Sequence, residues 1–470
     1  MFLKFLLTSL ILIPTIGNAS LKDAEYAYDH GKLDEKNLKK IIRELVEDNY
    51  YYATIPWLKE YIAIHSGKLS QDMDALLDEV ITQTGLEQFE AMPSSILERS
   101  GSSTIRFILA KKKVNTKNYE EALNIIKGVN EGSAIYPFAL HLKATTESML
   151  DKNNEAIKDF EECAEMSGKA SGKVKGERQK QLFVNRDSCV AGIARTYFAQ
   201  QEYAKADLKY LDIPKGALIW PDILFEEAWN SFYLGNYNRT LGKLVTYKAP
   251  VLDFIYNPEI DVLKGYSYLK LCLWEDAKKT AEDFYSLYME PARELRLLIN
   301  ENKKNNEFFY KAGFHPTHDK TRNQLLNNIL VSIAKDSAFL GIKKGLVDAT
   351  DEYQRLKGMS NLSLKNSLLR NLAEVLTVQR NIFGGYVKKQ MIAKYASLFR
   401  SFQYMSYIKL EILSSKKAEL YSPKAETEGG KRGDLKYIER NDKQYFWTFN
   451  GEFWADELGD YVFALRSECK

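Results

Sequence analysis

Apolar residues between positions 102 and 288 recur every third or fourth residue, with polar residues between them, which predicts a series of amphipathic helices. An aromatic residue followed three positions later by a small one recurs along this stretch, most clearly at Tyr119-x-x-Ala122, and a weaker copy has Asn153 in the aromatic position. The small residues of this phrase recur at steps of 34, 50, 34 and 37 residues, and the step of 50 is one of 34 plus an insertion of 16. In its stronger and weaker copies, this first column of small residues consists of Ala122, Ala156, Ala206, Thr240 and Ala277.

A second column of small residues precedes the first by twelve positions throughout this stretch. Two antiparallel helices joined by a short turn pack closely only where both side chains at the crossing are small. Gly235 falls between the two columns, where the first helix of a pair should end. We therefore expect paired helices whose small columns face each other. The second column consists of Ala110, Ala144, Ala194, Ala228 and Gly265.

The 34-residue step, the paired helices and the two small columns resemble the tetratricopeptide repeat family. The resemblance covers five units over residues 102–288, although the family's first-helix Trp and closing Pro are mostly missing. It implies a helical solenoid whose concave surface is built from the first helix of each unit.

The family's pattern also implies which residues line that concave groove. They lie six and three positions before, and one, four and five positions after, the small residue of each first helix. The family's carboxylate-clamp groove needs Lys and Asn, whereas this chain has aromatic residues and a few cations there, which favours an apolar helix or extended peptide as ligand. Alternatively, the chain's own N- or C-terminal segment fills the groove. The expected groove residues are Phe138, His141, Arg195, Phe198, Phe225, Trp229, Phe232, Tyr233, Tyr266 and Lys270.

The flanking stretches predict an all-α chain in which other helical parts surround the solenoid. Residues 20–101, with a Tyr50-x-x-Ala53 phrase, are expected to form degenerate or capping helices. Residues 289–421 predict a long helical hairpin with a coiled-coil seam, interrupted at Gly384-Gly385. A linker over 422–436 and an aromatic cap over 437–470 follow, and Asn450-Gly451 makes a β-hairpin one form of that cap.

The N-terminus has the features of a signal peptide over residues 1–19. Lys4 precedes a short apolar run from Phe5 to Ile13, and small residues at Gly17 and Ala19 precede Ser20. We expect cleavage after Ala19 and export to a bacterial periplasm, or alternatively secretion. The other interpretations are a short membrane anchor or a buried helix. No later segment is apolar enough to predict a transmembrane span.

Four cysteines follow the expected cleavage site, with spacings that match no zinc motif. In an oxidising compartment, disulfides are the natural interpretation. Cys163 and Cys189 fall on the adjoining helices of two successive repeats, so we expect them to pair, and a Cys272–Cys469 bond would attach the tail to the last repeat. The alternative is free thiols.

Charge and composition restrict the partners. The formal net charge of +3 over 470 residues is too balanced for a protein that mainly binds nucleic acid. The insertion near residues 168–180 interleaves Lys and Arg with Gly and Ser. This predicts an extended helix end with a solvated loop, or else a basic surface loop for an anionic partner such as lipid headgroups or cell-wall polymer.

Residues capable of catalysis are sparse, and we expect no enzyme, cofactor or metal site. The only histidine cluster is His315-Pro316-Thr317-His318-Asp319, which could supply two or three metal ligands but is more typical of a solvated loop. Four acidic residues of the tail lie near Trp447 and Trp454 and could form a sugar-binding site, or else a hairpin with exposed acids. They are Glu452, Asp456, Glu457 and Asp460.

The tail phrase from Phe449 to Gly459, together with Cys469, is similar to the tails of envelope repeat proteins of predatory and gliding bacteria. That resemblance implies a part in a cell-envelope or motility assembly. The expected function is thus a non-catalytic periplasmic scaffold or adaptor for other periplasmic or envelope proteins. The alternative is a glycan- or peptidoglycan-binding module that uses the aromatic and acidic tail.

Overall fold

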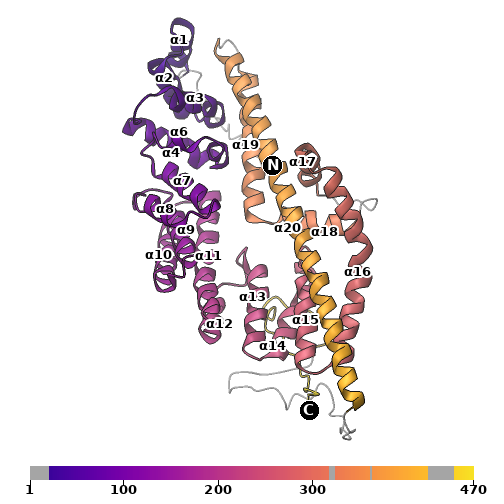
Figure 1. The fold of residues 1–470 in the computed structure, drawn as a ribbon. Coiled ribbons are helices and arrows are strands. Elements are labelled where there is room, and N and C mark those ends of the chain that lie inside the picture. Colours follow the sequence, from indigo (N-terminus) through magenta and orange to yellow (C-terminus); the bar gives the residue numbers. More distant parts are fainter. Residues whose placement is uncertain (1–20, 317–322, 360–362, 422–448, 470) are drawn as a thin grey trace, which may run out of the picture. The chain divides into compact units, whose positions relative to one another are not determined.

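The computed structural model describes residues 21–316, 323–359, 363–421 and 449–469, with the side chains of 416–421 left aside. All regular secondary structure in these ranges is helical (Figure 1). The chain divides into two compact units. One contains the residues up to Ser102 together with Val347–Thr377, and the other contains Ser103–Leu346 and Val378–Lys470. The expected signal peptide and linker, and most of the β-prone run before Asn450, lie outside the described residues.

The second unit contains five consecutive helical hairpins, as the repeat pattern predicts. The hairpins are α7 (Ser103–Asn115) with α8 (Tyr119–Ile126), α9 (Tyr136–Ser148) with α10 (Asn153–Ser171), α11 (Glu177–Ala199) with α12 (Tyr203–Leu211), α13 (Trp220–Tyr233) with α14 (Tyr237–Val245), and α15 (Glu259–Lys270) with α16 (Trp274–Glu301). Two 3₁₀ turns, Thr246–Lys248 and Pro250–Leu252, connect α14 to α15.

The two small columns are buried, and their members meet in the second, third and fourth hairpins. All ten residues of the columns are buried. Ala144 and Ala156 belong to one core cluster, and Ala194 and Ala206 belong to the next. The Thr240 hydroxyl donates to the carbonyl of Ala228 at 3.3 Å. The expected all-α, repeat-type solenoid is therefore confirmed.

Each hairpin turns through one residue with a left-handed backbone, five positions before the small residue of its second helix. The φ angles there lie between 56° and 80°. The next N–H donates five residues back, as from Asn118 to the Lys113 carbonyl at 2.9 Å, which closes the first helix. Four of the five turn residues are not glycine, so this turn is hard to find from composition alone. They are Lys117, Asp151, Gln201, Gly235 and Cys272.

The first unit repeats this turn once. Its helices are α1 (Lys22–His30), α2 (Glu35–Glu47), α3 (Tyr51–Ile64), α4 (Gln71–Thr84), α5 (Glu87–Glu90) and α6 (Ser94–Leu97), with parts of α19 and α20. Asn49, between α2 and α3, has φ 61°, and Tyr50 donates to the Leu45 carbonyl at 2.8 Å. The equivalent small residue is the buried Thr54. The phrase noticed in the sequence at Tyr50 is therefore one residue out of register.

Four helices follow the hairpins: α17 (Asn306–Phe314), α18 (Gln324–Ala334), α19 (Ser337–Gly358) and α20 (Lys365–Tyr421). The interruption expected at Gly384-Gly385 is wrong, because α20 continues through both glycines. A Cβ on Gly384 would lie 2.2 Å from the Asn306 carbonyl oxygen. The glycine thus permits a close crossing of α17 and α20 within the second unit.

The described part of the tail, residues 449–469, contains no strand and lies against α14. A Cβ on Gly242 would lie 1.6 Å from the Tyr461 carbonyl oxygen. The Asn238 side-chain amide donates to the Leu465 carbonyl and accepts from the Leu465 N–H, both at 3.0 Å, so it pairs with the tail as a neighbouring backbone would.

Disulfides join Cys163 to Cys189 and Cys272 to Cys469, the two pairs considered from the sequence. The first links α10 to α11 inside a buried cluster, and the second attaches the tail to the turn between α15 and α16. Within the described residues, no single helix has the length and apolar composition of a membrane span. The helices α18 and α19 have that length and composition only when they are counted together, and they are bent by 77° relative to each other.

Candidate protein-binding surface

The inner face of the last hairpin is occupied by the chain's own helix α20. Ser397 and Arg400 of α20 approach the Glu259 carboxylate of α15 at 2.9 and 3.6 Å. A Cβ on Gly265 would lie 2.8 Å from the Ile408 side chain, so the missing side chain makes room for α20. The face of α15 that the family's pattern assigns to the groove is therefore covered by an internal helix, and not by the N- or C-terminal segment considered from the sequence.

Two expected groove residues, Tyr266 and Lys270, lie on this occupied hairpin. Tyr266 is partly buried, and its pKa is raised by burial and by the nearby Tyr404 and Tyr407 hydroxyls of α20. Lys270 is exposed at the end of α15, next to the turn that holds Cys272.

At the opposite end of the expected groove, Phe138 and His141 of α9 are covered by α11. The Arg178 guanidinium lies 4.6 Å from the centre of the Phe138 ring. His141 Nδ1 lies 3.0 Å from Asn185 Oδ1, and burial lowers the pKa of His141, which favours the neutral ring. Both side chains therefore serve contacts between repeats.

Between these ends, the rings expected from α11 and α13 come together in one group, which we call the aromatic cluster. The Tyr203 and Tyr233 rings stack at 5.2 Å, and Phe198 meets both edge-on at 5.3 and 5.4 Å. Trp229 lies 6.0 Å from Tyr233, whose side chain is 52% exposed. The cluster consists of Phe198, Tyr203, Phe225, Trp229, Phe232, Tyr233 and Tyr237.

Two members of the aromatic cluster, Tyr203 and Tyr237, were not expected in the groove. Each is the aromatic residue of the repeated phrase, three positions before the small residue of a second helix. Each begins its helix, so its ring can reach the end of the preceding first helix. The phrase itself was therefore the signal that could have identified them.

Arg195, also expected in the groove, is engaged by a carboxylate of the next repeat. Its Nε and Nη2 donate to the two oxygens of Glu226 at 2.8 and 2.7 Å, and the Tyr210 hydroxyl donates to Glu226 at 3.2 Å. The Nε–Nη2 edge of this guanidinium is therefore already taken by a carboxylate of the chain and cannot clamp a ligand carboxylate. This contact agrees with the departure from the carboxylate-clamp pattern.

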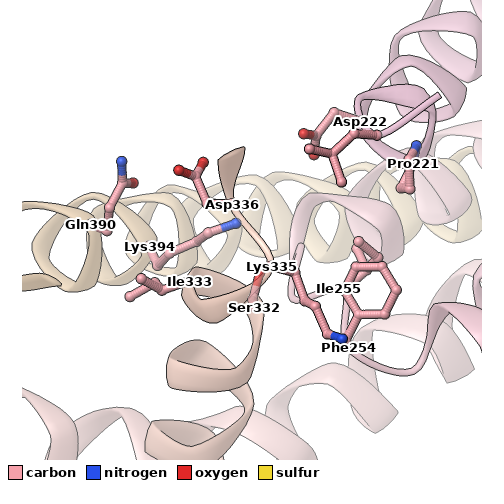
Figure 2. Close-up of a pocket in the computed structure, with 11 residues that line it drawn as sticks. Pro221, Asp222, Phe254, Ile255, Ser332, Ile333, Lys335, Asp336, Gln390 and Lys394 are labelled. Atoms are coloured by element: carbon pink, nitrogen blue, oxygen red, sulfur yellow. The ribbon is translucent and has the colours of Figure 1, made fainter. Parts of the chain in front are cut away.

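A pocket lies where α13 faces α18 and α20 (Figure 2), with a cavity of about 120 Å³. Asp222 occupies the position six before Ala228, which the family's pattern assigns to the groove, so the sequence could have identified it. Asp336, in the link between α18 and α19, and Lys394 of α20 lie beyond the repeats, where no register predicts them. The remaining lining residues are Leu218, Pro221, Phe254, Ile255, Ser332, Ile333, Lys335 and Gln390.

The candidate sites of the tail and the histidine cluster are only partly described. Trp454 is exposed, but Lys215 Nζ donates to Asp460 and to the Asp456 carbonyl, both at 2.6 Å, so Asp460 is already paired. His315 follows α17, whereas His318 lies outside the described residues. Among the residues that can be placed, no group of three His, Cys, Asp or Glu side chains could hold a metal ion.

Comparison with known proteins yields loose likenesses. No known protein family and no curated protein matches the chain. Among solved structures, the apo form of RapI is 12% identical, over 76% of this chain and 97% of its own, with a TM-score of 0.33. The Rap conjugation gene regulator of plasmid pLS20, in complex with the Phr* peptide, is 12% identical over 74% and 96%, with a TM-score of 0.31. At these scores the likeness supports no inference, and the description of the fold depends on the helices themselves.

Proposed function

We propose that this chain is a non-catalytic interaction scaffold that binds an apolar helix or an extended peptide at the aromatic cluster. The observation that carries the proposal is the half-exposed face of Tyr233, stacked on Tyr203 and flanked by Phe198 and Trp229. Tyr and Trp are the residues most often found at the energetic centre of protein interfaces, because they bury a large rigid surface.

The internal contact of α20 with α15 supports a helical or peptide ligand. α20 places the residues Met391, Leu398, Met405 and Ile412, seven apart, in the buried part of the second unit. One inner face of the solenoid thus already receives a helix with a regular apolar seam, which is the helix-in-groove mode of recognition. At α11 and α13, the described residues leave the end of the aromatic cluster exposed.

We further propose that the protein acts in the periplasm as part of a cell-envelope assembly, with secretion as the alternative. This proposal rests on the leader-like residues 1–19 and on the tail phrase that is similar to envelope repeat proteins. Two disulfides that use all four cysteines suit an oxidising compartment.

Photo-crosslinking tests the binding surface directly. A photoreactive phenylalanine at Tyr233 of the full-length protein, illuminated in native envelope extract, should give discrete protein adducts that disappear when Trp229→Ala is added. The matched control carries the same group at Tyr407, an exposed tyrosine of α20 outside the aromatic cluster. Identical adducts from both positions, or adducts at 233 that survive Trp229→Ala, would count against the proposed surface.

A further inference from the structure

The pocket between α13, α18 and α20 holds two carboxylates and two ammonium groups that do not pair with one another. Asp222 comes from α13, Lys335 and Asp336 from the link between α18 and α19, and Lys394 from α20. No ion pair joins any two of these four side chains in the described structure. Figure 2 shows Lys394 and Asp336 on one side of the pocket, and Asp222 with Phe254 on the other.

Both acceptors and donors of hydrogen bonds remain without partners at this site. One oxygen of Asp336 accepts from the Tyr386 hydroxyl and from the Phe339 N–H, and its other oxygen has no partner among the described residues. The Asp222 carboxylate accepts no hydrogen bond within the same ranges. Lys394 donates once, to the Tyr256 carbonyl at 3.1 Å, so two of its three donors remain.

Of the four charged groups, Asp336 and Lys394 are partly buried, and Asp222 and Lys335 are exposed. Burial lowers the pKa of Lys394, although the carboxylates of Asp222, Asp336 and Glu259 act in the opposite direction. Lys335 places its ammonium 5.7 Å from the centre of the Phe254 ring. An anion placed near Lys394 would therefore favour its charged form, and a cation placed between Asp222 and Asp336 would be attracted by both carboxylates.

An apolar wall completes the pocket. Phe254 and Ile255 lie on one side, and Ile333 and Pro221 are also part of the lining. A ligand that matches the site must carry a cation, an anion and an apolar group within a short distance. A simple anion would meet Asp222 and Asp336, and a simple amine would meet Lys335 and Lys394, so neither fits alone.

We propose that this pocket binds a zwitterionic α-amino acid with an apolar side chain. The ammonium group lies between Asp222 and Asp336, the carboxylate faces Lys394 and Lys335, and the side chain contacts Phe254, Ile255 and Ile333. This site is separate from the aromatic cluster, so the scaffold function can hold or fail independently of it.

Isothermal titration of the full-length protein tests the proposal with L-alanine, L-leucine and L-phenylalanine as probes. At least one should bind saturably below about 10 mM, the range expected for a small ligand with few contacts. The N-acetyl derivative, which lacks the cation, and the amide, which lacks the anion, should each bind about tenfold more weakly or not at all, since each leaves a charged group of the pocket without its partner.

Variants assign the contacts. Asp222→Asn changes an exposed residue. It should reduce the affinity for the amino acid about tenfold and bring that affinity closer to the affinity for the N-acetyl derivative. Lys394→Met should reduce the difference in affinity between the amino acid and its amide. Asp253→Asn is the matched control, because Asp253 is an exposed acid outside the pocket lining. It should leave the affinity for the amino acid and for both blocked derivatives unchanged. Absence of saturable binding for all three amino acids, or equal binding of both blocked derivatives, overturns the proposal.

Discussion

At the scale of single residues, the least expected feature is the buried carboxylate of Glu352. This side chain of α19 accepts from the backbone N–H groups of Tyr52 and Ala53 at 3.0 and 2.7 Å, so it caps the start of α3 from a distant part of the sequence. Arg355, one turn later, donates to the Asn49 carbonyl at 3.0 Å in the same turn. The first N–H groups of a helix need acceptors, and here the acceptor comes from another helix.

The Glu352 cap should make the first unit sensitive to pH. Burial raises the pKa of Glu352 from its ordinary 4.5 to about 7, even though the two N–H donors act to lower it. The folded state therefore holds its proton up to a higher pH than the unfolded state does. Stability should fall as pH rises from 4.5 to about 7, by about 3 kcal/mol in all.

Hydrogen exchange of α3 peptides, measured between pH 4.5 and 7.5 and corrected for intrinsic rates, checks this slope of stability against pH. Glu352→Gln retains a carbonyl oxygen for the cap but cannot titrate, so the slope should disappear. Glu60→Gln, an exposed position of α3, is the control and should retain it. A slope unaffected by Glu352→Gln would assign the pH dependence to other groups.

At the scale of elements, two adjacent glycines in α20 should respond in opposite directions to alanine. A Cβ on Gly384 would meet the Asn306 carbonyl of α17, whereas a Cβ on Gly385 would have nothing within 4 Å. Gly384→Ala should destabilise the protein by about 1–3 kcal/mol through this clash. Gly385→Ala should stabilise it by up to about 1 kcal/mol, because alanine has less backbone freedom than glycine in the unfolded chain and so loses less entropy on folding.

Urea unfolding of the two variants and the parent protein, followed by circular dichroism, decides the comparison. The variants differ by one position in one helix, so helix propensity cancels between them. Equal shifts of the same sign would mean that α17 does not cross α20 at Gly384.

The same glycines show how far sequence alone could predict these elements. The paired helices were predictable because Ala144 and Ala156, or Ala194 and Ala206, belong to a periodic pattern in which each position repeats one contact. Gly384 looked like a helix breaker because its neighbour Asn306 lies far away in the sequence. The pocket was missed for a related reason, since Asp222 follows the repeat register while Asp336 and Lys394 do not.

At the scale of the whole molecule, the covalent links and the buried acid discussed above fall in different units. Both disulfides lie in the second unit, and the Glu352 cap lies in the first. The Cys163–Cys189 bond closes a separation of 26 residues, so its loss should reduce stability by about 3 kcal/mol in the chain-entropy model. The effect should be largest in α10 and α11, which this bond connects.

Reduction of the disulfides and a change of pH should therefore alter the hydrogen-exchange rates of different peptides. Hydrogen exchange of the full-length protein with and without dithiothreitol should show faster exchange in α10 and α11, and in α14 where the released tail uncovers Asn238. Peptides of α3 should keep both their protection and their pH slope. A Cys469→Ser variant should reproduce only the change in α14, because it frees the tail and leaves the other disulfide intact. If reduction instead accelerated exchange in α3 as well, the two units would open together, and the stability of each would depend on that of the other.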